Sequence, residues 1–292
     1  MDGFFGGIVM EYFYLILQAV IFSFGGLLIK ASGTMVSPMM LSFLRFAIGV
    51  CLLLMIQGIK NRRLSLKLTG GWIVAGGMLK ALHYLGENYG VMRGFSYGGI
   101  IVWPIQTLVI LVVSVTVFKE KLTKRMALGT AMCLSGIALV TWNGASAEVF
   151  LEANAGTFIA FLFAGIGAAG FFVSQKRLVE NMDIVQMNVS MFIYGMFTTI
   201  LVLPAAGSHI RGSANIPGLV SILLLGAITC VGFLLQAAAI RKVPMVLATI
   251  IQSCTVILSI LWGVLFYGDP LSSYVIAGTV LFLMGIGVVT IH

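Results

Sequence analysis

Apolar stretches of helical length follow one another along this chain, and short segments of charged and turn-forming residues separate them. A helix needs about 20 apolar residues to cross the hydrocarbon core of a bilayer, so the pattern predicts ten membrane-spanning helices. We expect them at residues 12–30, 38–57, 71–92, 97–118, 124–142, 156–175, 184–205, 218–240, 244–267 and 271–291. The sequence therefore predicts an all-α integral membrane protein, because helices satisfy their backbone hydrogen bonds within lipid.

The composition leaves no room for a soluble domain. Of the 292 residues, 60% are hydrophobic and 9% are charged, and the mean hydropathy is +1.11. Too few charges remain to cover the surface of a soluble protein. The four cysteines lie inside apolar segments without the spacing of metal ligands, so no disulfide, metal or cofactor is expected. The first apolar segment lacks a basic leader and a cleavage site, so we expect it to be retained as a helix.

The basic residues are unevenly distributed among the predicted connections. Twelve of the 17 Lys and Arg residues follow spans two, four, six and eight, three lie in odd-numbered connections, and Arg45 and Lys80 lie within spans. Connections rich in Lys and Arg stay in the cytoplasm, so both termini are predicted to be cytoplasmic in a multi-pass inner-membrane protein. The same distribution accounts for the net charge of +8, so a nucleic-acid partner is not expected.

An internal repeat relates the two halves of the chain. A shift of 149 residues places the segment 122–141 on the segment 271–290, with eight identities in twenty positions that include two pairs of glycines. We therefore predict two five-helix units, residues 1–143 and 144–292. Because five is odd, the second unit enters the membrane inverted. Inverted repeats are typical of transporters that alternate between inward-open and outward-open conformations around a central site.

The first unit carries motifs that resemble the EamA-type unit of the drug/metabolite transporter superfamily. They are the run Phe22–Lys30, then Pro38 and Arg45 in the second span, and the run Phe118–Thr123 leading into Gly129 and Gly136. The resemblance covers both halves and implies ten helices, cytoplasmic termini and export of amino acids, other metabolites or drugs, so the substrate stays open. The second copy departs from the pattern: no arginine matches Arg45, and Asp269-Pro270 replaces Glu120-Lys121.

Glu87 is the acidic residue expected deep within a span. Lys80, His83 and Glu87 stand at positions i, i+3 and i+7, on one face of the third predicted helix. Ionisable groups are costly in lipid, so this face should point into the protein or into a water-filled cavity. One hypothesis is that Glu87 binds a substrate cation or a coupling proton, with His83 as relay. The alternative is an internal ion pair with Lys80 or Arg45, and for Arg45 a structural role is favoured.

The fourth predicted helix brings three further residues to a comparable depth, Trp103, Pro104 and Gln106. Pro104 is expected to kink this helix and to free a backbone carbonyl. Trp103 could line a substrate site by stacking or cation–π contact, or it could pack in the kinked helix. Beside the Glu87 face, a series of small residues predicts close approach of another helix, Gly86, Gly90 and Gly94.

Aromatic and amide side chains complete the predicted binding site. Candidates for an aromatic wall are Phe22, Phe24, Tyr84 and Tyr97. The 149-residue shift places Tyr84 on Phe233 and Glu87 on Gln236, so the second unit keeps an aromatic and a polar group without the charge. Gln236 and Gln252 are then neutral hydrogen-bonding partners for a substrate, or for each other between helices.

These observations favour a secondary transporter that exports small metabolites across the inner membrane by alternating access. Its partners would be a small-molecule substrate, the lipid bilayer and, through Glu87, protons. The sequence contains no phosphate-binding loop, so ATP hydrolysis by this chain is excluded. The alternative is proton-coupled efflux of quaternary cations and other drugs. A membrane-embedded enzyme acting on lipid-linked substrates is a lesser hypothesis because the expected catalytic motifs are missing, and a channel lacks rings of charge.

Overall fold

The structure, a computed structural model, describes residues 2–61, 64–93, 99, 102–121, 123–142, 155–206, 210–267 and 272–290. Throughout these residues the regular elements are helices, and the one β-type pairing is an isolated bridge between Val36 and Ile210. The predicted all-α class is therefore confirmed. The predicted unit boundary at residue 143, together with Gly94, Tyr97 and Asp269-Pro270, lies outside the described residues.

The helices follow the predicted spans in order, and their bounds are as follows. They are α1 (Asp2–Ser23), α2 (Gly25–Ser32), α3 (Pro38–Asn61), α4 (Gly71–Arg93), α5 (Val102–Thr116), α6 (Lys124–Trp142), α8 (Ala155–Leu178), α9 (Ile184–Val202), the 3₁₀ turn η2 (Leu203–Ala206), α10 (Ile216–Ile240), α11 (Met245–Gln252), α12 (Cys254–Tyr267) and α13 (Ser273–Thr290). By length and composition, six segments of the described chain are long and apolar enough to cross a bilayer. The predicted number of ten crossings stays a prediction.

Two predicted helices are each broken near their middle. The expected helix 12–30 divides into α1 and α2 at Phe24, and the expected helix 244–267 divides into α11 and α12 at Ser253. A serine hydroxyl bonds to a preceding carbonyl at both breaks: Ser23 to Val20 at 2.6 Å and Ser253 to Thr249 at 2.8 Å. Such bonds compete with the helical backbone pattern and bend helices.

The described part of the fourth predicted helix is α5, from Val102 to Thr116. Pro104 lies in the first turn of this described part, close to residues 100 and 101, which lie outside the described residues. The predicted kink at Pro104 stays a prediction.

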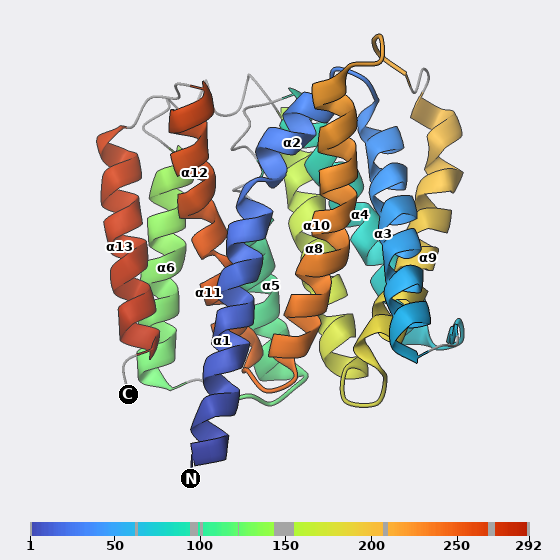
Figure 1. Cartoon of the computed structure of the whole chain (residues 1–292). Coiled ribbons are helices and arrows are strands. Elements are labelled where there is room, and N and C mark those ends of the chain that lie inside the picture. The colour runs from blue at the N-terminus through green and yellow to red at the C-terminus, as the bar shows by residue number, and fades with distance from the viewer. Residues whose placement is uncertain are drawn as a thin grey trace.

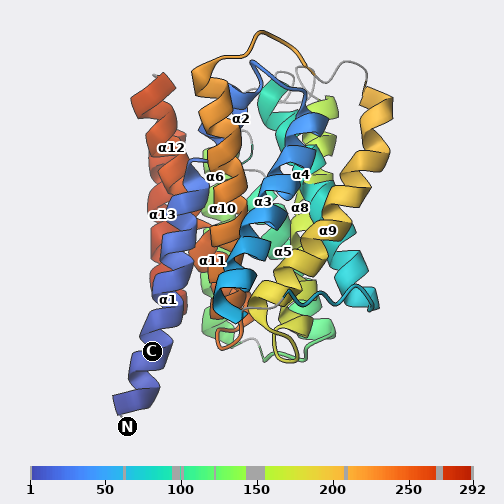
Figure 2. The same cartoon turned by 45° about the vertical axis from the view of Figure 1, so that its right-hand side comes forward.

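The two halves of the chain pack against each other as one bundle (Figures 1 and 2). Helices of the first half have their most extensive partners in the second half: α4 packs on α8, α3 on α9, α1 on α10 and α6 on α13. The beginning of α1 and the end of α13 lie at the same end of the bundle (Figure 1). We call this the terminal end, and the opposite end, where α2 ends and α10 begins, the far end.

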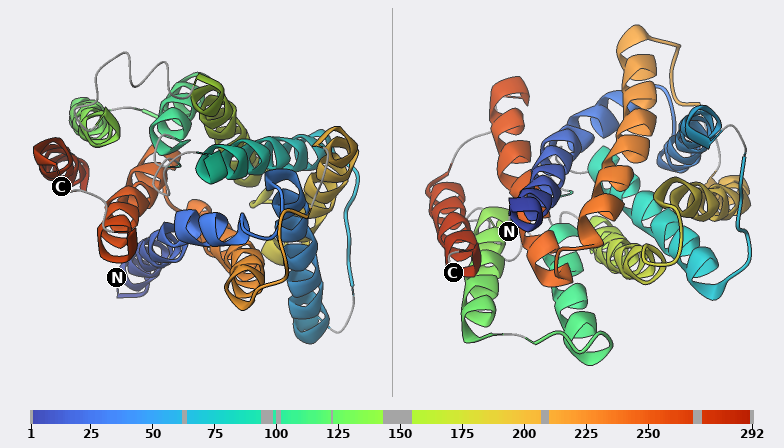
Figure 3. Two further views of the ribbon diagram at one scale, coloured as in Figure 1. Left: turned by 90° about the horizontal axis from the view of Figure 1, so that it is seen from above. Right: turned by 60° about the horizontal axis from the view of Figure 1, so that its bottom comes forward.

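Contacts between α6 and α13 obey the symmetry expected of inverted repeats. These two helices form a pair at one edge of the bundle (Figure 3). A Cβ on Gly136 would lie 2.5 Å from the carbonyl oxygen of Gly278, and a Cβ on Gly129 would lie 2.8 Å from that of Gly285. Gly129 corresponds to Gly278, and Gly136 to Gly285, under the 149-residue shift. The two contacts are thus exchanged by the repeat, as at a two-fold interface.

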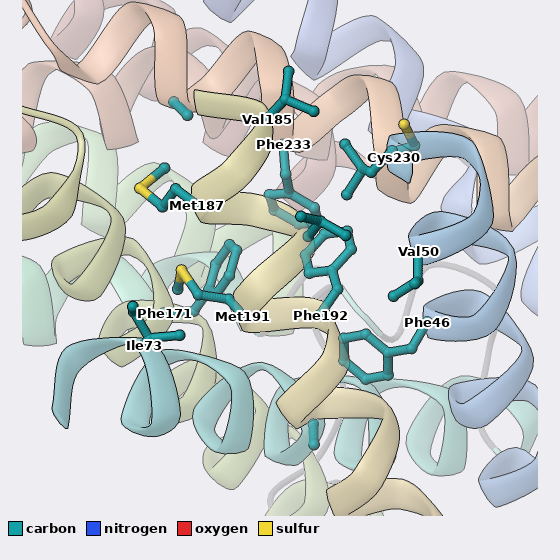
Figure 4. Close-up of a cluster of buried hydrophobic side chains, with 14 of the residues drawn as sticks. Phe46, Val50, Ile73, Phe171, Val185, Met187, Met191, Phe192, Cys230 and Phe233 are labelled. Carbon is teal, nitrogen blue, oxygen red and sulfur yellow. The ribbon is translucent and has the colours of Figure 1, made fainter. Parts of the chain in front are cut away.

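An aromatic cluster fills the core where α3, α8, α9 and α10 meet (Figure 4). The ring of Phe233 lies 5.0 Å from that of Phe171 and 6.0 Å from that of Phe192, both in edge-to-face geometry. Phe46 completes the cluster at 5.7 Å from Phe192. Aromatic pairs of this geometry add packing energy beyond the buried area. This aromatic core holds α3, α8, α9 and α10 together. Neighbouring residues along these helices contribute to the site described below.

Candidate functional site

A cavity lies between the two halves of the chain, with about 740 Å³ of space among its lining atoms, counting the part open to solvent. Helices α1 to α5 supply one side of its wall, and α8, α10 and α12 supply the other. Both helix breaks reach it, through Gly25 and Gly26 after the first and Thr255 after the second. Broken helices expose backbone polar groups, which a membrane protein tolerates beside a cavity.

Seven of the eight side chains that the sequence suggested for substrate binding line this cavity, namely Phe22, His83, Tyr84, Glu87, Trp103, Gln106 and Gln236. The eighth, Gln252, is buried behind Gln236 and lies 3.2 Å from its side-chain oxygen. Phe24 is not part of the wall and stacks on Trp262 at 4.9 Å between ring centroids. The structure thus brings the suggested residues together at one place.

Arg45 of α3 and Glu87 of α4 form an ion pair on the cavity wall. Arg45 Nη1 lies 3.0 Å from Glu87 Oε2 and donates to Asn88 Oδ1 at 2.9 Å. Asn88 in turn donates to the hydroxyl of Ser42 at 2.8 Å, and the guanidinium carbon lies 3.6 Å from the centroid of the Tyr84 ring. The ion pair with Arg45 that the sequence left as an alternative is therefore present.

Lys80 occupies an aromatic enclosure at the deep end of the cavity. Its ammonium lies 3.8 Å from the ring centroid of Phe233 and 4.3 Å from that of Tyr84, and the residue is 1% exposed. Its Nζ shares a hydrogen bond of 2.7 Å with His83 Nδ1. On the other side of the ring, His83 Nε2 lies 3.8 Å from Glu87 Oε2. Lys80, His83, Glu87 and Arg45 thus form one connected polar chain.

A ladder of buried amides begins at the cavity and leads toward the terminal end. Gln236 on the cavity wall accepts from Gln18 at 2.8 Å and donates to Gln175 at 2.6 Å. Gln175 donates to Asn188 at 2.7 Å, and Gln252 donates to Gln18 at 2.8 Å. The ladder joins α1 of the first half to α8, α9, α10 and α11 of the second. Because amides bond strongly in a low dielectric, it ties the two halves together below the cavity.

Sequence reasoning missed several members of this site. Gln18 and Gln175 are 0% exposed. The signal in the sequence was an amide within an apolar span for Gln18 and an amide at the end of one for Gln175. Phe171 of α8 also lines the cavity, but it stands among many phenylalanines and carried no distinguishing pattern. Gly86 and Gly90 behave as predicted, since a Cβ on either would collide with α8 at Ala160 or Phe161.

Comparisons with known proteins give a family for this chain and a solved structure of similar fold. A family model described as the EamA-like transporter family matches the chain twice, over residues 9–142 and 155–291. A comparison with curated proteins found no match. One solved crystal structure is similar over 98% of both chains, with a TM-score of 0.78 and 15% sequence identity. At that identity the likeness concerns the fold alone.

Proposed function

This chain belongs to the EamA-like transporter family, and we propose that it exports small metabolites, such as amino acids or related amphipathic compounds, by alternating access. The family consists of multi-pass membrane transporters of small solutes. The finer proposal includes the inner membrane as its location and the cytoplasm as the side of both termini, which rests on the distribution of Lys and Arg among the connections.

The observation that carries the proposal is the cavity wall shared by the two repeats. Both repeats contribute side chains to this wall. The first repeat supplies Lys80, Tyr84 and Glu87, and the second supplies Phe233 and Gln236. A site between two inverted repeats can be exposed to either side of the membrane when one repeat rocks against the other.

The contacts around the cavity support an outward-facing conformation. The cavity wall extends from the level of Lys80 to Val91 on α4, toward the far end of the bundle. At the terminal end, Glu11 pairs with Lys242 at 2.7 Å, and Glu120 accepts from the backbone N–H of Met245 at 3.4 Å. Both contacts join the first half to the second. With cytoplasmic termini, these contacts and the amide ladder form the closed inner gate.

The charges of the cavity bear on the alternative, efflux of quaternary cations. Such a function needs a carboxylate available to the cation, as Glu87 was expected to be. Glu87 is instead engaged by Arg45 at 3.0 Å in this conformation. The geometry therefore supports metabolite export over cation efflux.

Proton coupling through Glu87 belongs to the proposal and sets the central experiment. We would measure uptake and counterflow in proteoliposomes with pooled labelled amino acids and quaternary ammonium compounds, with and without a pH gradient. Glu87→Gln is expected to abolish the response to the pH gradient. Normal transport with unchanged pH dependence in this variant would exclude Glu87 as the coupling site, and no flux from any pool would contradict the transport proposal.

A double variant separates coupling from structure. Glu87→Gln alone leaves the buried Arg45 without its carboxylate, which can damage the protein for reasons unrelated to protons. In Arg45→Gln/Glu87→Gln both charges are removed. If Glu87 carries the proton, the double variant regains stability while its response to the pH gradient stays lost. Recovery of both stability and the response to the pH gradient would show that Glu87 has only a structural role, as the partner of Arg45.

A further inference from the structure

Lys80 is a buried basic side chain without a carboxylate partner within ion-pair distance in the described part of the chain. Within the described residues, the ion pairs involve Arg45, Lys60, His83 and Lys242, and Lys80 takes part in none of them. The cavity wall includes two strongly basic side chains, Arg45 and Lys80, and one carboxylate, Glu87, which pairs with Arg45. Lys80 is therefore the basic side chain of the cavity that the carboxylate of Glu87 does not pair with.

The surroundings of Lys80 stabilise an ammonium without neutralising it. Its contacts are one hydrogen bond to the His83 ring and the faces of Tyr84, Phe171 and Phe233, at 4.3, 5.0 and 3.8 Å from the ring centroids. Ring faces attract a desolvated cation by about 2 kcal/mol, whereas burying an unpaired ion costs several. Two of the three ammonium hydrogens also have no oxygen or nitrogen acceptor in the described contacts of Lys80.

We infer that Lys80 and His83 form a subsite for the carboxylate of the transported solute, with the aromatic enclosure receiving its apolar part. This inference rests on the proposed function and narrows its substrate class to carboxylates with an apolar body, amino acids among them. The carboxylate would accept from the two remaining ammonium hydrogens. Phe22 and Phe233, whose rings lie 5.0 Å apart, offer apolar surface next to this position.

The repeat makes the subsite one-sided. Under the 149-residue shift, Lys80 corresponds to Thr229 and Tyr84 to Phe233. The structure pairs them reciprocally, because Tyr84 bonds to Thr229 at 2.9 Å while Lys80 lies on the ring of Phe233. The second repeat thus has a hydroxyl at the matching position and no charge. A solute with one carboxylate can therefore place that carboxylate only at the Lys80 side of the cavity. This fixes the orientation of the solute relative to the axis that relates the repeats.

Equilibrium binding to the purified full-length chain in nanodiscs tests the inference. The probes are two pairs that differ only in the charged group: phenylacetate with phenylacetamide, and L-phenylalanine with L-phenylalaninamide. Calorimetry is expected to show binding of the acids and little binding of the amides. Lys80→Met should weaken acid binding roughly ten- to hundredfold, the effect of losing a hydrogen bond to a charged group, while Lys80→Arg keeps most of it.

Two controls keep the result interpretable. Lys124→Met removes an exposed lysine at the start of α6, away from the cavity, and should bind the acids like the original chain. Thermal unfolding of Lys80→Met should be unimpaired, because an apolar side chain suits this buried site. Equal binding of acids and amides, no binding of either acid, or binding unaffected by Lys80→Met would overturn the subsite.

Flux measurements on the same preparations separate this inference from the proposed function. Flux of cationic or neutral solutes without preference for carboxylates would overturn the subsite and leave transport intact. Binding of the acids that depends on Lys80, without flux of any solute, would support the subsite and overturn transport.

Discussion

Among single residues, Arg45 illustrates how a charge can be held inside an apolar bundle. One of its terminal nitrogens bonds to both Glu87 and Asn88, and its face lies on the Tyr84 ring, while its Nε has no hydrogen-bond partner. The guanidinium is already incompletely satisfied in the native state. Removing its carboxylate therefore leaves a buried charge with a single amide partner, which is more costly than removing the whole pair.

We expect Glu87→Gln to lower the free energy of unfolding by about 3 kcal/mol, because breaking one side of a buried ion pair strands the other. Arg45→Gln/Glu87→Gln should recover much of this loss. Thermal unfolding in detergent, followed by loss of the monodisperse peak, measures both variants against the original chain. A single variant as stable as the double variant would show that leaving Arg45 without its carboxylate carries no cost in stability.

Among the helices, the apolar pattern predicted positions well and interruptions poorly. Hydropathy identifies a stretch such as 244–267 as one segment, since Ser253 is tolerated in apolar helices. The break depends on a bond from its hydroxyl to Thr249, a choice that a sequence pattern does not record. The sequence pattern did not predict the break at Phe24 for the same reason, because it does not record how a serine hydroxyl bonds.

The candidate site was predictable to the extent that one helix carries it. The i, i+3, i+7 spacing placed Lys80, His83 and Glu87 on one face, and the structure keeps them there. The sequence offered Lys80 or Arg45 as the partner of Glu87 without deciding between them, because Arg45 comes from another helix, α3. The amide pairs of Gln236 with Gln18 and Gln175 were not predicted, because these residues come from helices far apart in sequence.

The α6–α13 contact yields a prediction at the level of whole helices. Gly136→Ala puts a methyl group 2.5 Å from the Gly278 carbonyl oxygen and 2.7 Å from the backbone nitrogen of Phe282, where no side chain can move aside. We expect a loss of about 1 to 3 kcal/mol in unfolding free energy from this overpacking. Gly287→Ala is the matched control on α13, since nothing lies within 4 Å of the added methyl group. Equal unfolding temperatures for the two variants would argue against this packing.

The molecule as a whole is built from an inverted repeat, but the ionisable residues of its cavity are not divided equally between the two copies. Both halves match the same family model and their glycine contacts are exchanged by the repeat, so we expect each half to be able to adopt the other's conformation. The ionisable residues of the cavity nevertheless come from the first half, and their counterparts in the second are Thr229 for Lys80 and Gln236 for Glu87. We therefore expect symmetry to provide the motion and asymmetry to provide substrate recognition.

The proposed outward-facing conformation can be tested with two glycines that have room for a side chain. Gly25 lines the cavity and Gly58 lies near the end of α3 that faces the cytoplasm in the proposed orientation, and nothing lies within 4 Å of a Cβ at either. In a chain whose native cysteines are replaced by alanine, Gly25→Cys should react with a membrane-impermeant maleimide in right-side-out vesicles. Gly58→Cys should react in inside-out vesicles.

Each cysteine is the control for the other, because the Gly58→Cys reaction reports sidedness without depending on the cavity. A Gly25→Cys variant that reacts only in inside-out vesicles, while Gly58→Cys reacts as expected, would show that the cavity opens to the cytoplasm.

A transported carboxylate should slow the Gly25→Cys reaction in two ways. It occupies the cavity, and it favours conformations in which the amide ladder has opened and the far end has closed. Since the ladder through Gln18 and Gln236 must break in that step, Gln18→Leu should shift the balance toward the cytoplasm and lower Gly25→Cys labelling even without a solute.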